Sequence, residues 1–129
     1  MEQKTHFKIN KHLSGELIEL KEGYCKIRLV TTSEMITDDS GLIHGGYTFG
    51  LADYAAMLAI NHPNVVLGGA DVRFVVPVIK GDILIAEGLV IRTEGKKIIV
   101  DVNIKREEEI VFIGQFICFA PEKYVLENV

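Results

Sequence analysis

One carboxylate in an otherwise apolar segment is the first feature of this sequence that could do chemistry. Residues 47–60 read Tyr-Thr-Phe-Gly-Leu-Ala-Asp-Tyr-Ala-Ala-Met-Leu-Ala-Ile, and Asp53 is the single charge among them. Burying an unpaired carboxylate is costly, and buried carboxylates usually pair or shift their pKa. Such a group beside a cleft or a subunit boundary is a candidate general base or nucleophile. A solvated aspartate on a narrow exposed strip is the plainer alternative.

The turn His44-Gly45-Gly46 stands directly before this segment. Two glycines at the start of a helix leave the N–H groups of its positive end unobstructed, which suits an oxyanion or a polarised carbonyl. A simple tight turn with a structural histidine is the alternative. Gly45 and Asp53 lie about 12 Å apart along a helix axis, at 1.5 Å per residue. One carbonyl group cannot contact both within one chain, so joint action predicts a dimer with shared sites.

The hydrophobic pattern and the turn residues indicate the elements that must position these groups. The expected strands are 16–20, 24–32, 67–79, 82–92, 97–106 and 109–120. A loop is expected at 33–45 and a helix at 46–61, which His62-Pro63 ends because proline disfavours helix at the residue before it. Pro77 predicts an edge, an end or a bulge in the strand that contains it.

The expected helix has no polar face, whereas a helix on the surface of a sheet would show one. It is therefore predicted to be buried. Consecutive strands joined by short turns imply an antiparallel sheet. We predict a single α+β domain, 1–129, in which a five- or six-stranded antiparallel sheet wraps around one long central helix. Segments 1–13 and 121–129 are expected to be an N-terminal extension and a C-terminal tail. The last strand is apolar on both faces, which predicts contact with another subunit.

Composition and charge restrict the classes of function. A chain of 129 residues with 48% hydrophobic and 25% charged residues is typical of one globular domain. A net charge of −4 with scattered basic residues argues against nucleic-acid binding. No apolar run approaches the ~18 residues of a membrane span, and the polar N-terminus is unlike a secretion signal. Cys25 and Cys118 lack zinc or redox spacing and are predicted to be free thiols in a reducing cytoplasm, without metal or cofactor.

Three segments together resemble the PaaI-like acyl-CoA thioesterases of the hotdog-fold superfamily. They are Gly41-Leu42-Ile43-His44-Gly45-Gly46, Leu51-Ala52-Asp53, and the run from Gly69 to Asp82 with its Pro-x-x-x-Gly-Asp ending. The resemblance extends from about Thr31 to Phe119. It implies a hotdog fold and hydrolysis of acyl thioesters of coenzyme A without a separate cofactor. It also implies a homodimer, which in this family often pairs again into a tetramer.

The resemblance also implies roles for individual residues. Asp53 matches the general base or nucleophile, and the N–H of Gly45 matches the donor that polarises the thioester carbonyl from the opposite subunit. His44 and Asp38 are further catalytic candidates. Asp38 stands where many relatives carry an amide; an ionised aspartate only accepts hydrogen bonds, so it would hold a water or act as a second acid. The substrate-binding candidates are Gly46, Asp39, Met57 and Gly69. The last two stand where some relatives place a hydroxyl, which predicts a more apolar acyl pocket.

The main alternative is a hotdog module that binds acyl thioesters without turnover. Asp38 in place of an amide favours this alternative, and the retained Asp53 disfavours it. A hotdog dehydratase is less well supported, because no Asp-x-Asn-Pro-x-His run accompanies the helix. The phosphates of coenzyme A would meet basic residues at strand ends, and the candidates are Lys80, Arg92, Lys96 and Lys97.

Overall fold

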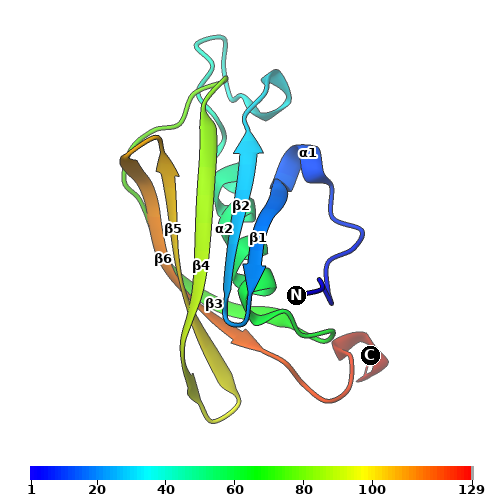
Figure 1. Ribbon diagram of the computed structural model, residues 1–129. Helices are drawn as coiled ribbons and strands as arrows, with labels where there is room; N and C mark the ends of the chain where they lie inside the picture. The colour runs from blue at the N-terminus through cyan, green and yellow to red at the C-terminus, as the bar shows by residue number, and fades with distance from the viewer. Residues whose placement is uncertain (129) are drawn as a thin grey trace.

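The computed structural model describes residues 1–128, which form one sheet and one long helix (Figure 1). The strands are β1 (Glu16–Lys21), β2 (Tyr24–Val30), β3 (Val66–Phe74), β4 (Ile83–Glu94), β5 (Lys97–Arg106) and β6 (Glu109–Phe119). The helical elements are α1 (Lys11–Ser14), the long α2 (Gly45–Ile60) and two short 3-10 helices, η1 (Ser33–Met35) and η2 (Val125–Asn128).

The six strands form one antiparallel sheet in the order β1-β2-β4-β5-β6-β3. Strands β1 and β3 are therefore the two edges of the sheet. Figure 1 shows the sheet curving around α2. The predicted α+β hotdog architecture, with a central helix and a wrapping antiparallel sheet, is confirmed.

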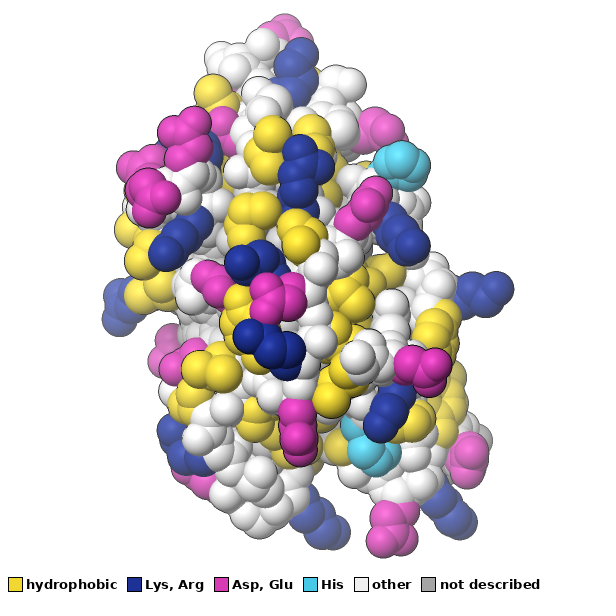
Figure 2. Space-filling model, viewed as in Figure 1, with side chains coloured by type: hydrophobic (Ala, Val, Ile, Leu, Met, Phe, Trp, Pro, Cys, Tyr) yellow, Lys and Arg dark blue, Asp and Glu magenta, His cyan; other side chains and the backbone are white. Residues whose placement is uncertain are grey.

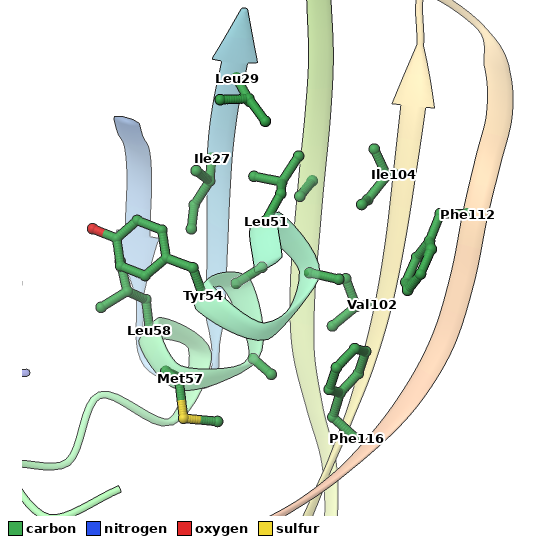
Figure 3. Packing of buried hydrophobic residues seen from close by; sticks show 14 of the residues in the cluster. Ile27, Leu29, Leu51, Tyr54, Met57, Leu58, Val102, Ile104, Phe112 and Phe116 are labelled. Atoms are coloured by element: carbon green, nitrogen blue, oxygen red, sulfur yellow. The ribbon is translucent and has the colours of Figure 1, made fainter. Parts of the chain in front are cut away.

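The long helix is buried on almost every side, as its lack of a polar face predicts. Its buried residues are Thr48, Leu51, Ala52, Tyr54, Ala55, Ala56, Met57, Leu58 and Ala59. Figure 3 shows the helix packing onto side chains of β2, β5 and β6, among them Ile27, Leu29, Val102, Ile104, Phe112 and Phe116. These contacts hold the helix, and with it Asp53, in a fixed position against the sheet.

The helix and the sheet approach each other closely at Gly88 of β4. A Cβ atom on this residue would lie 2.6 Å from the carbonyl oxygen of Ala55 and 3.3 Å from the Cβ of Ala59. The thiol of Cys25 donates a hydrogen bond to the same Ala55 carbonyl, at 3.0 Å. Small residues on both elements therefore set the spacing between α2 and the sheet.

Adding a methyl group at Gly88 is expected to destabilise the protein. The carbonyl of Ala55 belongs to the helix backbone and cannot move aside as a side chain can, so Gly88→Ala should cost about 1–3 kcal/mol through overpacking. Leu89→Ala is the matched control: Leu89 is the next residue, is 51% exposed, and should change stability by about 0.5 kcal/mol or less. Chemical denaturation measures both. Equal effects of the two variants would contradict the tight contact.

Most expected element boundaries differ from the observed ones by one or two residues, and one differs by more. The helix runs from Gly45 to Ile60 rather than over 46–61, because His44 is the extended N-cap and Asn61 takes a left-handed C-cap conformation with φ 53°. The strand expected at 67–79 ends at Phe74. The backbone beyond it bonds to the loop before the helix instead, with Ile43 N–H donating to Val78 O at 2.8 Å. The expectation that Pro77 marks a strand end is correct.

The last strand, β6, is apolar on both faces but buries them unequally. Phe112 and Phe116 are fully buried, whereas Ile110 and Ile113 are each 40% exposed. Figure 2 is viewed from the same side as Figure 1, in which α2 lies behind the sheet, so it shows the outer surface of the sheet. Acidic and basic side chains are mixed with apolar ones on this surface. Contact of this outer surface with a further subunit remains a prediction.

Candidate active site

Asp53 lies near the middle of α2 and is half-buried. Its Oδ1 atom is buried and has no hydrogen-bond partner among the described residues. Burial raises the pKa of this carboxyl above its ordinary value. Asp53 lines a cavity of about 710 Å³ together with Met57 and the start of β3. The helix thus presents a carboxylate with spare acceptor capacity to a cavity large enough for a ligand.

The two cysteines are free and buried. Burial, with a smaller contribution from the charge of Asp53, raises the pKa of Cys118 to about 12. Burial also raises the pKa of Cys25 to about 12. Both side chains are therefore protonated thiols at neutral pH, and neither has the properties of a nucleophilic cysteine.

The start of α2 leaves its first N–H groups free of a side-chain cap. His44 is the N-cap residue, but its exposed ring makes no capping hydrogen bond. It lies edge-on to the ring of Tyr47, with 6.2 Å between centroids. The N–H groups of Gly45 and Gly46 belong to the first helical turn, where no intrahelical acceptor exists. They form a cluster of donors at the positive end of the helix dipole.

Gly45 lines a second cavity, of about 300 Å³, whose walls are apolar apart from Thr48. Phe74, at the end of β3, is its closest neighbour: a Cβ on residue 45 would lie 3.3 Å from the phenyl ring. Asp53 is not among the residues lining this cavity, and Gly45 does not line the cavity of Asp53. Within the described chain, the two groups face separate cavities, in agreement with the distance predicted from the sequence.

The other candidates predicted from the sequence fall in several places. Met57 lines the cavity of Asp53, one helical turn away. Gly69 lies in β3, where a Cβ would contact Ile117 at an ordinary 3.7 Å. Asp38 is exposed and organises the turn before the helix, because its Oδ1 accepts hydrogen bonds from Ser40 N–H at 2.9 Å and Leu42 N–H at 3.4 Å.

Asp38 and the neighbouring Asp39, which is also exposed, line neither described cavity. The basic candidates for the phosphates of coenzyme A are likewise absent from the linings of both. Arg92 pairs with Glu94 at 2.5 Å, and Lys96 lines a separate cavity near Phe119. The structure therefore keeps these side chains apart from Asp53 and Gly45 within one subunit.

The segment Lys4–Ile9 is a part of the site that the sequence did not indicate. All six of its residues line the cavity of Asp53, and Tyr124 from the C-terminal tail lines it too. The sequence predicts these two segments only as an N-terminal extension and a C-terminal tail of the domain, with no role in the site. Their packing depends on contacts between distant residues, for which no local pattern gives a signal.

Residues 1–128 contain no group of three or more His, Cys, Asp or Glu side chains placed to hold a metal ion. None of the helices in that range has the length and apolar character needed to cross a membrane.

A sequence profile of the thioesterase superfamily matches residues 40–113, which contain Gly45, Asp53 and most of the sheet. The chain belongs to this superfamily, and the expected family is confirmed. The uncharacterized protein PH1136 from Pyrococcus horikoshii is 54% identical, with a TM-score of 0.96 over 98% of this chain and 97% of that one. Methylthioribose-1-phosphate isomerase from Aquifex aeolicus is 48% identical over 90% of this chain. Transcription factor FapR from Caldanaerobacter subterraneus is 36% identical over 88% of this chain.

The chain spans 25% of the length of that isomerase and 58% of that FapR protein. Two more distant structures share the fold alone. The PaaI protein from Escherichia coli is 24% identical with a TM-score of 0.79, covering 88% of this chain and 84% of that one. The protein smu.793 from Streptococcus mutans, solved with acetyl CoA bound, is 19% identical with a TM-score of 0.80, covering 92% and 97%.

Proposed function

We propose that this protein hydrolyses acyl thioesters, with acyl-CoA as the substrate, at sites shared between two subunits. The observation that carries the proposal is Asp53, a half-buried carboxylate with an unpaired oxygen beside a ligand-sized cavity. Membership of the thioesterase superfamily supports the class of reaction. The acetyl CoA bound to smu.793, a protein of the same fold, supports the class of substrate.

Pairing of two β3 edges would complete the site. Val66 and Leu67, at the start of β3, line the cavity of Asp53, and Phe74, at its end, lines the cavity of Gly45. Two β3 strands paired antiparallel would place the Asp53 cavity of one subunit against the Gly45 cavity of the other. Phe74 and Val75 are 55% and 51% exposed, which provides an apolar surface beside the unpaired edge.

In the proposed mechanism, the thioester carbonyl accepts a hydrogen bond from Gly45 N–H, and the helix dipole stabilises the negative charge that develops on its oxygen. Asp53 of the partner subunit then acts in one of two ways. As a general base, it takes a proton from a water whose oxygen attacks the carbonyl carbon. As a nucleophile, it forms a mixed anhydride that water hydrolyses. In both routes the C–S bond breaks and coenzyme A leaves as a thiolate.

A panel of acyl-CoA substrates tests the proposal through the release of free thiol. We expect catalytic turnover of at least one member, at a rate in the usual range of about 1–1000 per second. Binding of acyl-CoA without thiol release would contradict hydrolysis and support the second candidate, a module that only binds acyl thioesters. Two observations favour that candidate: the likeness to a transcription factor over 88% of the chain, and the use of the Asp38 carboxylate in a turn.

A further inference from the structure

The segment Lys4–Ile9, called the strap from here on, forms one wall of the cavity that contains Asp53. The superfamily match begins at residue 40, so the strap, like strands β1 and β2, precedes the matched residues. Figure 1 shows the N-terminal segment extending from α1 to a position beside the carboxyl end of α2. The strap therefore lies against the helix that carries Asp53 and closes part of the cavity of that residue.

Asn61 fastens the strap to the helix that carries Asp53. Its side-chain Nδ2 donates to the carbonyl of Glu2 at 2.8 Å, and its Oδ1 accepts from Lys4 N–H at 2.7 Å. Asn61 is itself 8% exposed and is the C-cap of α2. Thr5, between the fastened residues and the rest of the strap, is 7% exposed. The strap is therefore a docked wall of the cavity.

His6 is the polar ring of the strap. Its backbone has φ 60°, a left-handed conformation that is uncommon outside glycine and is often found at functional sites. Its Nδ1 shares a hydrogen bond with Thr5 Oγ1 at 2.8 Å, and its ring lies 6.1 Å from that of Tyr54. Burial lowers the pKa of His6, so the ring is neutral at pH 7. The Nε2 atom has no protein partner among the described residues and is available to a ligand.

The two cavities differ in chemistry in a way that matches the two ends of an acyl thioester. The strap cavity carries Lys4 and Lys8, and Asp53 is its one acidic residue. The Gly45 cavity is lined by apolar side chains and Thr48. A phosphopantetheine arm has two amides and a phosphate, whereas an unsubstituted acyl chain is apolar. Basic and hydrogen-bonding groups suit the first, and an apolar wall suits the second.

We propose that the strap cavity binds the phosphopantetheine arm of the thioester, with His6 Nε2 hydrogen-bonded to an amide of that arm and Lys4 and Lys8 beside its phosphate. This inference rests on the proposed function. An amide offers both an N–H and a carbonyl, so either neutral tautomer of His6 finds a partner. The acyl group then extends from Asp53 toward the apolar cavity of the partner subunit.

The variant His6→Asn tests the hydrogen bond, because asparagine tolerates a left-handed backbone but has a shorter side chain. The amide lies far from the bond that breaks, so its loss should raise KM for acyl-CoA about 3- to 10-fold and leave kcat unchanged. His12→Asn is the matched control, since His12 is an exposed histidine on α1, and it should change neither constant. Thermal unfolding verifies that both variants are folded.

Substrates with shortened arms separate the proposed contacts. The effect of His6→Asn should persist on an acyl N-acetylcysteamine thioester, which keeps one amide, and vanish on a simple alkyl thioester, which has none. The double variant Lys4→Gln, Lys8→Gln should raise KM for acyl-CoA and leave KM for the N-acetylcysteamine thioester unchanged, because only the first has phosphates. Equal effects on all three substrates, or none, would overturn the inference. The same acyl group on a carrier protein distinguishes that source of the arm from coenzyme A.

Failure of the proposed function has a different signature. If the wild type hydrolyses no thioester, a non-hydrolysable thioether analogue of acyl-CoA still tests the strap by calorimetry. Weaker binding of this analogue to His6→Asn than to His12→Asn would support the inference without hydrolysis. Equal binding to both variants, or no binding to the wild type, would contradict it.

Discussion

Replacing Asp53 with asparagine is expected to reduce thioester hydrolysis by about a thousandfold or more, within the range that loss of a general base or nucleophile produces. The amide has almost the same shape as the carboxylate, but it can neither take a proton from water nor form an anhydride. Thiol release from the best acyl-CoA substrate measures the effect as a fall in kcat. Asp101→Asn is the control, because Asp101 is an exposed aspartate on β5, away from the β3 edge, and does not line the cavity of Asp53. Near-full activity of Asp53→Asn would refute the assignment.

The same substitution should make the folded protein more stable at neutral pH. Burial raises the pKa of Asp53 in the folded state above its ordinary value of 3.8, so ionising this group costs free energy of folding. The cost is complete above the folded-state pKa, and it vanishes as the pH falls below the ordinary value. Asp53→Asn should therefore melt at a higher temperature than the wild type at pH 7, with the difference disappearing in acid. A lower melting temperature at pH 7 would indicate that the ionised carboxylate is paired in the assembled protein.

Mixing two inactive variants is expected to restore activity if each site is shared. Gly45→Val should be inactive, because its side chain crowds both the adjoining N–H and the Phe74 ring, which lies 3.3 Å from a Cβ at this position. In a heterodimer of Gly45→Val with Asp53→Asn, one site carries both defects and the other carries none. Random pairing makes half of the dimers mixed, so the mixture should recover about a quarter of wild-type activity.

Co-expression of differently tagged chains, followed by tandem purification, isolates the heterodimer for this measurement. Size-exclusion chromatography and circular dichroism verify that each variant is folded and dimeric. Activity of the heterodimer no higher than that of its two parents would show that Asp53 and Gly45 do not act across the subunit boundary. A monomeric wild type would contradict the shared site directly.

The buried helix was predictable because its evidence is local. Fourteen residues with a single charge, Asp53, have no face to offer to solvent, and no tertiary contact is needed to see this. Because Gly45 and Asp53 belong to one helix, their spacing in the sequence also predicts the distance between them along the helix axis. The runs of strand residues and the short turns between them predict the antiparallel sheet, which the structure forms from six strands.

The expectations that were wrong or incomplete depend on partners distant in sequence. The run after Phe74 is apolar enough for a strand, but its backbone bonds to the loop at Ile43 instead. Asp38 differs from these cases, because its carboxylate accepts hydrogen bonds from its near neighbours Ser40 and Leu42, and its role in catalysis stays a prediction. No local pattern in the sequence indicates the strap, because the hydrogen bonds that hold the N-terminal segment join it to Asn61, which is 57 and 59 residues away from its two partners.

The double attachment of Asn61 gives this protein a built-in reporter. The residue that ends α2, with its N–H bonded to Met57 O at 2.8 Å, also holds the strap through its side chain. A ligand that fastens the strap should therefore slow the opening of the last helical turn, and a ligand that displaces the strap should speed it. Amide hydrogen exchange at Asn61 would then read occupancy of the cavity directly, whether or not the bound molecule is ever turned over.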